Sequence, residues 1–238
     1  MVSDGSESWP SGRPRLPRGF VDDFKRQRCA AAIADLAHEG GTQAVTTARV
    51  TARAKMAKAT FYDLFDGRDT AFRYACDYGR ELLLEALHGA AEVPGTWEER
   101  LGRTIGALLD AAAENPNLAE LCIVHSKSLE PEHGKPYDGI LTDAFAEVLT
   151  EILPADLEER VFSFSELAAA AIVSIVARWL ITEGNEDLSE LRGELTAIVS
   201  MPYRREHSAR AARPERPGMS PGLLGQDWPG PGRSRSST

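Results

Sequence analysis

Between Thr46 and Arg68 the chain gathers hydroxyl, ammonium and guanidinium groups at helical spacing. Groups of these types contact the phosphate oxygens and base edges of nucleic acids. Any one of them alone is more often a polar surface residue, but the whole set in register favours contact with DNA. The residues concerned are Thr46, Thr47, Lys55, Lys58, Ala59, Thr60, Tyr62 and Arg68.

Four of these residues are suited to the DNA backbone. Thr46 and Thr47 stand at a predicted helix start, where hydroxyl groups and free N–H groups bind phosphate oxygens. Tyr62 offers a hydroxyl one helical turn after Lys58, and Arg68 places a cation at the start of the following helix. We therefore predict that Thr46, Thr47, Tyr62 and Arg68 bind phosphates.

Three neighbouring residues are suited to base edges. Lys58 is expected to donate to guanine O6 and N7, a contact that contributes roughly 1–3 kcal/mol of discrimination. Ala59 and the methyl group of Thr60 are expected to contact a thymine methyl group. Phe61 and Phe65, on the same predicted helix, are expected in the core.

These side chains need a small helical frame. Thr46 is a good N-cap for a helix over about 47–54, and a second short helix over 58–65 follows the turn Lys55-Met56-Ala57. A preceding helix over about 22–39 has one apolar stripe and ends at Gly40-Gly41. Helices of two turns are not stable alone in water, so the three must pack together. This arrangement predicts a helix-turn-helix.

The segment resembles the DNA-binding part of the TetR family of bacterial regulators over about residues 24–75. The family pattern is Thr-x3-Ile-Ala-x2-Ala-Gly-Val-Ser-x2-Thr-aromatic or aliphatic-Tyr-x2-Phe, followed by Ser-Lys-Glu. The resemblance implies a dimeric regulator that binds an operator and a small-molecule effector. Its character is kept here by Thr46, Val50, Ala54, Thr60, Phe61, Tyr62, Phe65 and Asp69, with Arg68 in place of the lysine.

Two positions depart from that pattern. Lys55 stands where the family has glycine, in a turn that usually needs a left-handed backbone, which costs a non-glycine residue roughly 1 kcal/mol. Ala57 replaces the usual serine and removes an N-cap that contributes about 1 kcal/mol. Either the turn is remodelled, or Lys55 contributes a phosphate contact.

The rest of the chain is expected to form a helical body. Apolar periodicity predicts helices over 69–89, 97–114, 118–129, 137–153, 162–182 and 188–201, and no segment has the alternation of a strand. The predicted fold class is therefore all-α, with an N-terminal three-helix helix-turn-helix domain (21–68) and a helical ligand-binding and dimerisation domain (69–203). Composition predicts a disordered arm over 1–20 and a disordered basic tail over 204–238.

Charge is unevenly distributed along the chain. The formal net charge is −9. Residues 21–75 contain nine basic and seven acidic residues, whereas residues 76–201 contain eight basic and twenty-four acidic ones. A mildly basic front and a strongly acidic body predict one face for polyanions and another for a different partner.

The cysteines and the termini indicate where the protein works. Cys29, Cys76 and Cys122 are widely spaced within helical patterns, which favours buried free thiols in a reducing compartment. The N-terminus has no signal-peptide pattern, and no apolar run approaches the roughly 20 residues that cross a bilayer. The expected location is cytoplasmic.

Two further sites are predicted in the body. The side chains expected to line an effector pocket, although aromatic residues at helical spacing are more often core, are Phe72, Trp97, Leu101, Leu121, His125, Phe145 and Phe162. The segment 162–182 is apolar on nearly all sides and, with 188–201, is expected to form a four-helix interface with a second copy; the alternative is an intrachain core. Candidate interface residues are Ala169, Ile172, Val176, Trp179, Leu191, Leu195 and Ile198.

No catalytic residues, phosphate-binding loop or zinc spacing are found, so an enzyme is not expected. One group of histidines and glutamates has side chains that can bind a metal, but its spacing matches no metal-ligand motif. The group consists of His125, Glu120, Glu130, Glu132 and His133. No metal or cofactor is therefore predicted.

Taken together, these features predict a ligand-responsive DNA-binding transcriptional regulator. It is expected to be a repressor that binds a palindromic operator as a homodimer and is released by a small molecule. The alternative is a helical protein-interaction module that has lost regulated DNA binding, which Lys55 and Ala57 favour.

Overall fold

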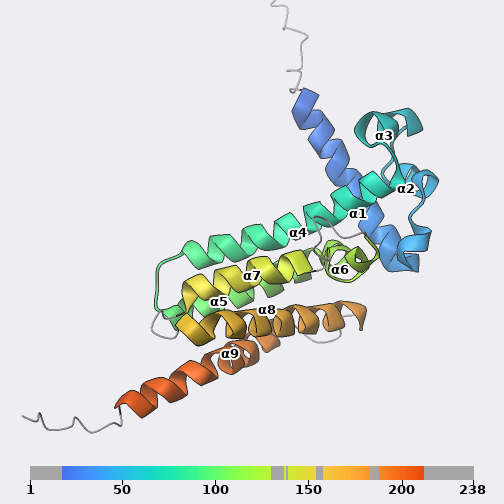
Figure 1. Cartoon of the computed structure of the whole chain (residues 1–238). Coiled ribbons are helices and arrows are strands. Elements are labelled where there is room, and N and C mark those ends of the chain that lie inside the picture. Colours follow the sequence, from blue (N-terminus) through green and yellow to red (C-terminus); the bar gives the residue numbers. More distant parts are fainter. Residues whose placement is uncertain (1–17, 130–136, 138, 154–157, 183–187, 212–238) are drawn as a thin grey trace, which may run out of the picture. The chain divides into compact units, whose positions relative to one another are not determined.

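The computed structural model describes residues 18–129, 137, 139–153, 158–182 and 188–211. The chain divides into two compact units, residues 1–200 and 201–238. Every regular element in the described residues is a helix, which confirms the predicted all-α class (Figure 1). The elements are α1 (Arg18–Ala44), α2 (Thr47–Arg53), α3 (Lys58–Leu64), α4 (Arg68–Glu92), α5 (Trp97–Glu114), α6 (Pro116–Ile123), η1 (His125–Ser128), α7 (Gly139–Ile152), α8 (Glu158–Ile181) and α9 (Leu188–Ala211).

The first three helices pack around one apolar cluster. The predicted stop at Gly40-Gly41 is confirmed, because both residues leave helical geometry and Gly41 has a φ of 66° inside the span of α1. Val45, which follows this stop, belongs to the same buried cluster as Ile33 and Val50. Phe61 and Phe65 complete this cluster, as their apolar character predicts.

We call α1 to α3 the head and the helices from α5 onward the body. Helix α4 joins the head to the body, and it packs against α1 as well as α5, α6 and α7 (Figure 1). Its first half contributes Phe72 and Cys76 to the cluster of the head. Its second half contributes Leu83 and Leu87 to a larger cluster in the body. One helix therefore carries residues of both cores.

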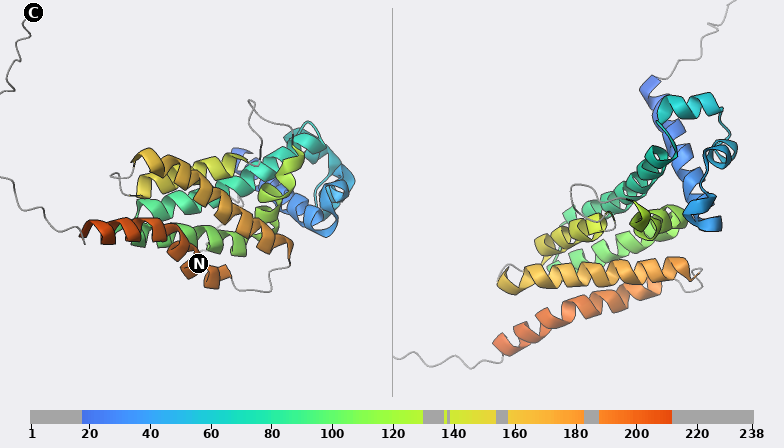
Figure 2. Two further views of the ribbon diagram at one scale, coloured as in Figure 1. Left: turned by 60° about the horizontal axis from the view of Figure 1, so that its bottom comes forward. Right: turned by 45° about the vertical axis from the view of Figure 1, so that its right-hand side comes forward.

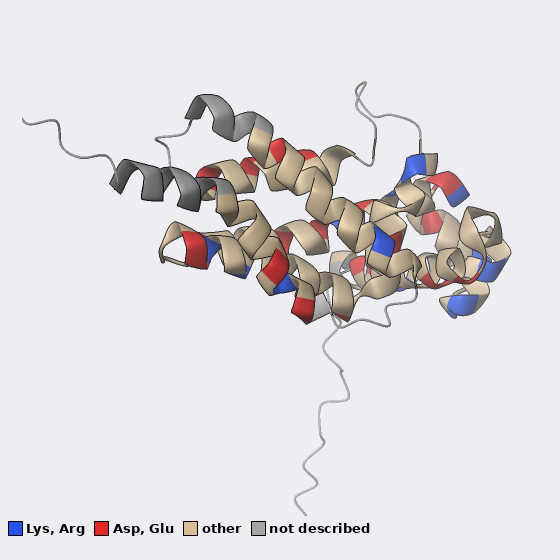
Figure 3. Cartoon of the chain, turned by 90° about the horizontal axis from the view of Figure 1, so that it is seen from below, with Lys and Arg blue, Asp and Glu red and all other residues tan. Residues whose placement is uncertain are grey.

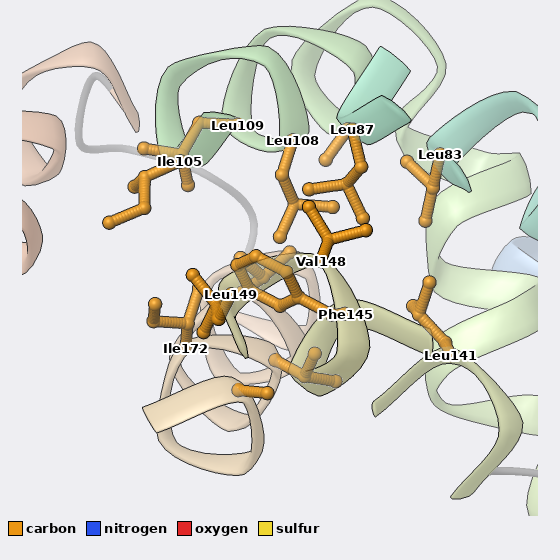
Figure 4. Close-up of a cluster of buried hydrophobic side chains, with 14 of the residues drawn as sticks. Leu83, Leu87, Ile105, Leu108, Leu109, Leu141, Phe145, Val148, Leu149 and Ile172 are labelled. Carbon is orange, nitrogen blue, oxygen red and sulfur yellow. The ribbon is translucent and has the colours of Figure 1, made fainter. Parts of the chain in front are cut away.

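The body core lies among α4, α5, α7 and α8, where leucine, isoleucine and phenylalanine side chains interdigitate (Figure 4). Helix α5 has the bounds that the sequence predicts. Thr96 accepts from the backbone N–H of Glu99 at 3.3 Å, and the Glu99 carboxylate accepts from the Thr96 N–H at 2.9 Å. This capping box satisfies two donors that the helix cannot, and so fixes its start.

Helix α6 approaches α4 closely at Gly79. A Cβ atom at that position would lie 2.8 Å from the Leu118 carbonyl oxygen and 3.4 Å from the Cys122 Cβ. Only a residue without a side chain allows this spacing. The predicted helix over 118–129 is wrong in its bounds, because α6 already begins at Pro116 and ends at Ile123, and η1 follows.

The first turns of α9 pack on α5, where the Arg192 Nε donates to the Gly102 carbonyl oxygen at 3.1 Å. The prediction that this helix ends near Met201 is wrong, because α9 continues through Pro202 to Ala211 (Figure 2). A helix passes a proline at the cost of one backbone hydrogen bond. Helix α1 begins at Arg18, within the predicted arm (1–20), and α9 covers the first residues of the predicted tail (204–238) up to Ala211. The other residues of the arm and the tail lie outside the described part of the chain.

Candidate nucleic-acid interface

The start of α2 has the geometry that its threonines predict. Thr46 is extended, with φ −116° and ψ 150°, and its hydroxyl accepts from the Arg49 backbone N–H at 3.3 Å. Thr46 is exposed and Thr47, the first residue of α2, is half-buried. An N-cap of this kind leaves other first-turn N–H groups free to meet an anion.

The turn between α2 and α3 keeps its left-handed residue in spite of the missing glycine. Lys55 has a φ of 49°, and among the described residues it is the one non-glycine with a positive φ. Its N–H donates to the Ala52 carbonyl oxygen at 3.2 Å, and the Met56 N–H donates to the Thr51 carbonyl oxygen at 3.0 Å. Of the two alternatives that the sequence left open, local remodelling of the turn is therefore excluded.

An arginine of α1 supports this turn, which sequence reasoning missed. The Arg28 Nη2 donates to the carbonyl oxygens of Ala54 and, at 3.3 Å, of Lys55. A cation at the C-terminal end of α2 also complements the partial negative charge of that helix end. Ala57, at the N-cap of α3, provides no side-chain hydrogen bond, as its type predicts.

Helix α3 exposes one face and buries the other. Lys58, Ala59 and Tyr62 are exposed, whereas Phe61 is fully buried. The Lys58 Nζ lies 5.9 Å from the centroid of the Tyr62 ring, and the Tyr62 ring meets Phe61 edge-on with centroids 5.6 Å apart. The core therefore fixes the orientation of a face that presents an ammonium, a methyl group and a phenol.

The remaining predicted contacts flank this face. Thr60 is half-buried, so less of its methyl group is available than the sequence suggests. The exposed side chain of Lys55 lies in the turn before the face. In Figure 3 basic positions mark the end of the protein that holds the short helices, while acidic positions recur along the body.

Arg68, at the start of α4, makes contacts within the chain. Its Nε donates to the Val45 carbonyl oxygen at 2.7 Å, its Nη2 to the Thr42 carbonyl oxygen at 2.8 Å, and its Nη1 to the Asp69 carboxylate at 2.8 Å. The guanidinium therefore ties α4 to the segment between α1 and α2. Phosphate binding, which the sequence predicts for it, has to compete with these three acceptors.

A polar network connects α1 with α2 and was not foreseen. Arg53 donates to Glu39 at 2.6 Å and lies 3.4 Å from Asp35, and Arg49 lies 3.5 Å from Glu39. The hydrogen bond to Glu39 raises the pKa of Arg53. Pairs between residues 10 to 18 positions apart leave no trace in helical periodicity, so only the folded chain shows them.

The same face of α1 contacts α6. Asn117 donates to Asp35 at 2.9 Å, and the Glu120 carboxylate lies 2.6 Å from the His38 Nδ1 and 3.1 Å from the His125 Nε2. His125 is therefore a partner of Glu120 and not a free pocket residue. Among the described residues no group of three His, Cys, Asp or Glu side chains is placed to hold a metal, and Glu130, Glu132 and His133 lie outside that range.

Most of the predicted pocket residues fill the hydrophobic clusters. Less than 5% of the surface of each of Phe72, Leu101, Leu121 and Phe145 is accessible, so these residues are core and do not line an open pocket. Trp97 is half-buried against the body core. The side chain of Phe162 lies outside the described residues.

The predicted interface residues of α8 and α9 divide between core and surface. Ala169, Ile172, Val176 and Leu195 belong to the core of their own chain, and Trp179 and Leu191 pack against it. Ile198 is 60% exposed, as are Leu167 (67%) and Ile181 (59%), which the sequence did not single out. Because α8 is apolar on nearly all sides, its sequence does not show which side faces inward.

Within the described residues one segment, Phe164–Ile181 of α8, is long and apolar enough to cross a membrane by length and composition. The sequence-based expectation that no run approaches that length is corrected accordingly. One side of this segment is part of the body core.

The three cysteines are buried free thiols, as their spacing predicts. Burial raises the pKa of the Cys29 thiol to about 11, and the charge of Arg28 opposes the rise. Burial also raises the pKa of the Cys122 thiol to about 12, and the charge of Arg80 opposes the rise. All three thiols thus stay protonated near neutral pH.

The described helices define an all-helical protein with an N-terminal helix-turn-helix on a helical body. Solved structures show which known proteins share this arrangement. A TetR-like transcriptional regulator from Rhodococcus sp. RHA1 matches with a TM-score of 0.63 and 15% identity over 80% of this chain and 99% of its own. The TetR-family regulator PfmR from Thermus thermophilus matches with a TM-score of 0.59 and 22% identity over 72% and 96%.

A third solved structure is the transcriptional regulator FadR from Bacillus subtilis in complex with stearoyl-CoA. It matches with a TM-score of 0.62 and 15% identity over 73% of this chain and 96% of its own. No protein-family model matches the sequence, and no curated protein resembles it significantly. The chain therefore has the fold of TetR-like transcriptional regulators.

Proposed function

We propose that the protein is a cytoplasmic transcriptional regulator that binds operator DNA as a homodimer. The observation that carries the proposal is the exposed face of α3, where Lys58, Ala59 and Tyr62 stand on a helix fixed by the buried Phe61. Two turns of helix enter a major groove, and a two-fold dimer addresses half-sites about 34 Å apart. The TetR-like fold supports this function.

Within this proposal each residue has a role. Lys58 reads guanine, Ala59 and Thr60 contact thymine, and Tyr62 donates to a phosphate. Thr46, Thr47 and Lys55 add backbone contacts from α2 and the turn. Arg68 acts as a positioning residue, because its guanidinium holds the segment before α2 against α4.

We further propose that a small molecule bound in the body releases the DNA. Helix α4 carries core residues of the head and of the body, so a shift of α4 changes the separation of the two α3 helices in a dimer. Such coupling is typically worth 1–3 kcal/mol. Acyl-CoA thioesters are one effector class to test, since FadR from Bacillus subtilis was solved with stearoyl-CoA.

A mobility-shift titration at several salt concentrations tests DNA binding, with fragments upstream of the protein's own gene. The double variant Lys58→Ala with Tyr62→Ala is expected to lose at least tenfold in affinity, and Lys127→Ala, an exposed lysine of the body, serves as the matched control. Each lost phosphate contact lowers the slope of log affinity against log salt concentration by about 1. Because Arg68 is proposed to position α2 and not to contact a phosphate, Arg68→Gln is expected to weaken binding and leave this slope unchanged.

Equal affinity of the double variant and the wild type would remove α3 from the interface. Absence of salt-sensitive, sequence-specific binding in the wild type would favour the alternative of a protein-interaction module. The preserved turn at Lys55 argues against that alternative, because a module without DNA has no need to keep a left-handed lysine.

A further inference from the structure

A polar cluster lies where α4 meets the start of α7, and the DNA interface does not use it. Arg73, Asp77 and Arg80 follow one another at i, i+4 and i+7 on α4, so they share one face. Tyr137, two residues before α7, is 4% exposed, and its ring packs against Arg73 and Arg80. Its ring centroid lies 5.3 Å from the Arg73 Cζ and 5.1 Å from the Arg80 Cζ.

One carboxylate oxygen serves two donors in this cluster. The Tyr137 hydroxyl donates to the Asp77 Oδ1, and the Arg80 Nη2 donates to the same atom at 2.7 Å. Burial and the hydrogen bond to Asp77 raise the pKa of Tyr137, so the phenol stays protonated and acts as a donor. Asp77 thus holds the start of α7 to the middle of α4.

The Arg80 guanidinium pairs with Asp77 through Nη2, and its other terminal nitrogen, Nη1, takes no part in that pair. Within the part of the chain that the structure describes, the Arg80 Nη1 is buried and has no hydrogen-bond partner, and the side chain as a whole is 18% exposed. Burying a charged donor without an acceptor is unfavourable, so such a group marks a place where an acceptor is missing. The charge of the guanidinium also opposes the rise in the pKa of the buried Cys122 thiol on α6.

The chemistry of the missing acceptor follows from the donor. A guanidinium is planar and permanently charged, and it pairs its N–H groups with the oxygen atoms of carboxylates and phosphates. Apolar residues close to the site in the sequence pack against the two clusters, such as the half-buried Leu84, four residues after Arg80 on α4, and Ile140, three residues after Tyr137. An anionic group on an apolar chain fits these surroundings.

We propose that the Arg80 Nη1 binds the carboxylate or phosphate group of an anionic amphiphile, and that this molecule is the effector. The inference rests on the proposed function, since it names the chemical class of that effector. The bound anion adds a second negative charge to the guanidinium whose Nη2 already pairs with Asp77. Repulsion between the anion and the Asp77 carboxylate loosens the pair between Arg80 and Asp77. Arg80 lies twelve residues after Arg68 on α4, roughly 18 Å along the axis, so the loosened helix leads directly to the DNA-binding head.

Isothermal titration calorimetry of the full chain without DNA tests the proposal, so that its failure and a failure of DNA binding are seen separately. The probes are octanoate, octyl phosphate and the neutral octanol at constant ionic strength. At least one anionic probe is expected to bind tenfold more tightly than octanol. The preferred anion then identifies the effector as a carboxylate or a phosphate.

Two variants separate ligand binding from stability. Both remove the ion pair between Arg80 and Asp77, so they share its loss of stability, but they are expected to change the affinity for the anion in opposite directions. Arg80→Gln is expected to weaken the anionic probe at least tenfold, whereas Asp77→Asn, which removes the repelling carboxylate, is expected to tighten it at least threefold. Arg26→Gln, which removes the exposed pair with Asp23, is the matched control and should change affinity less than twofold.

Three results would overturn the proposal. The first is that no probe binds the wild type, and the second is that octanol binds as tightly as the anions. The third is that Asp77→Asn weakens binding as Arg80→Gln does, since a purely structural role of the pair predicts that both variants move in the same direction.

Discussion

Lys55 combines a conformational cost with a position at the proposed DNA surface. A side chain in the left-handed region costs roughly 1 kcal/mol, and Arg28 holds the carbonyl oxygens of Ala54 and Lys55 in place. The protein thus keeps a charged residue where glycine would be more stable. We propose that a phosphate contact of Lys55, one of the two alternatives that the sequence leaves open, accounts for that choice.

Replacing Lys55 by glycine is expected to stabilise the protein by roughly 0.5–1 kcal/mol, because glycine adopts a φ of 49° without strain. The corresponding rise in melting temperature is about 1–4 °C for a chain of this size. Glu85→Gly, at an exposed position inside α4, is the control and should lower stability by about 1 kcal/mol. Lower stability of Lys55→Gly would contradict the turn geometry, and an unchanged salt dependence of DNA binding would exclude the phosphate contact.

At the scale of elements, the sequence predicts helix ends that depend on neighbouring residues, but it does not predict contacts between residues far apart in the chain. The bounds of α5 were predicted correctly because Thr96 and Glu99 lie three residues apart and cap the helix by themselves. The ties of Arg68 to Val45 and of Asn117 to Asp35 join residues 23 and 82 positions apart, and no periodicity encodes them. For the same reason the predicted effector pocket stays a prediction, since apolar spacing shows that Leu101 is buried and not what it faces.

The approach of α4 to α6 at Gly79 gives a test at this scale. Gly79→Ala is expected to destabilise the protein by roughly 1–3 kcal/mol, because the new Cβ meets the Leu118 carbonyl oxygen at 2.8 Å and forces the helices apart. Gly89→Ala, on the same helix with nothing within 4 Å, should be neutral or stabilise by up to about 1 kcal/mol. Chemical denaturation of both variants measures the difference. Equal effects would contradict the close packing of the two helices.

At the scale of the whole molecule, the proposed DNA binding needs a defined orientation, because the body is strongly acidic and the head is mildly basic. The residues 76–201 contain twenty-four acidic and eight basic residues, so the body is repelled by phosphates while the head is attracted. The two short helices of a single head can make only a few contacts with DNA, and these have to outweigh the repulsion between the body and the phosphates. A dimer doubles the contacts and keeps both bodies away from the duplex.

The exposed apolar residues of α8 and α9 are where such a dimer would form. Leu167→Glu with Ile198→Glu is expected to convert the dimer to a monomer at micromolar concentration, because each carboxylate would be buried without a partner in a two-fold interface. Val93→Glu, another exposed apolar residue between α4 and α5, is the control and should stay dimeric. Sedimentation velocity measures the change, and the monomeric variant should also lose operator affinity. A wild-type protein that sediments as a monomer would remove the dimer from the proposed function, and a dimer that survives both glutamates would move the interface to another face.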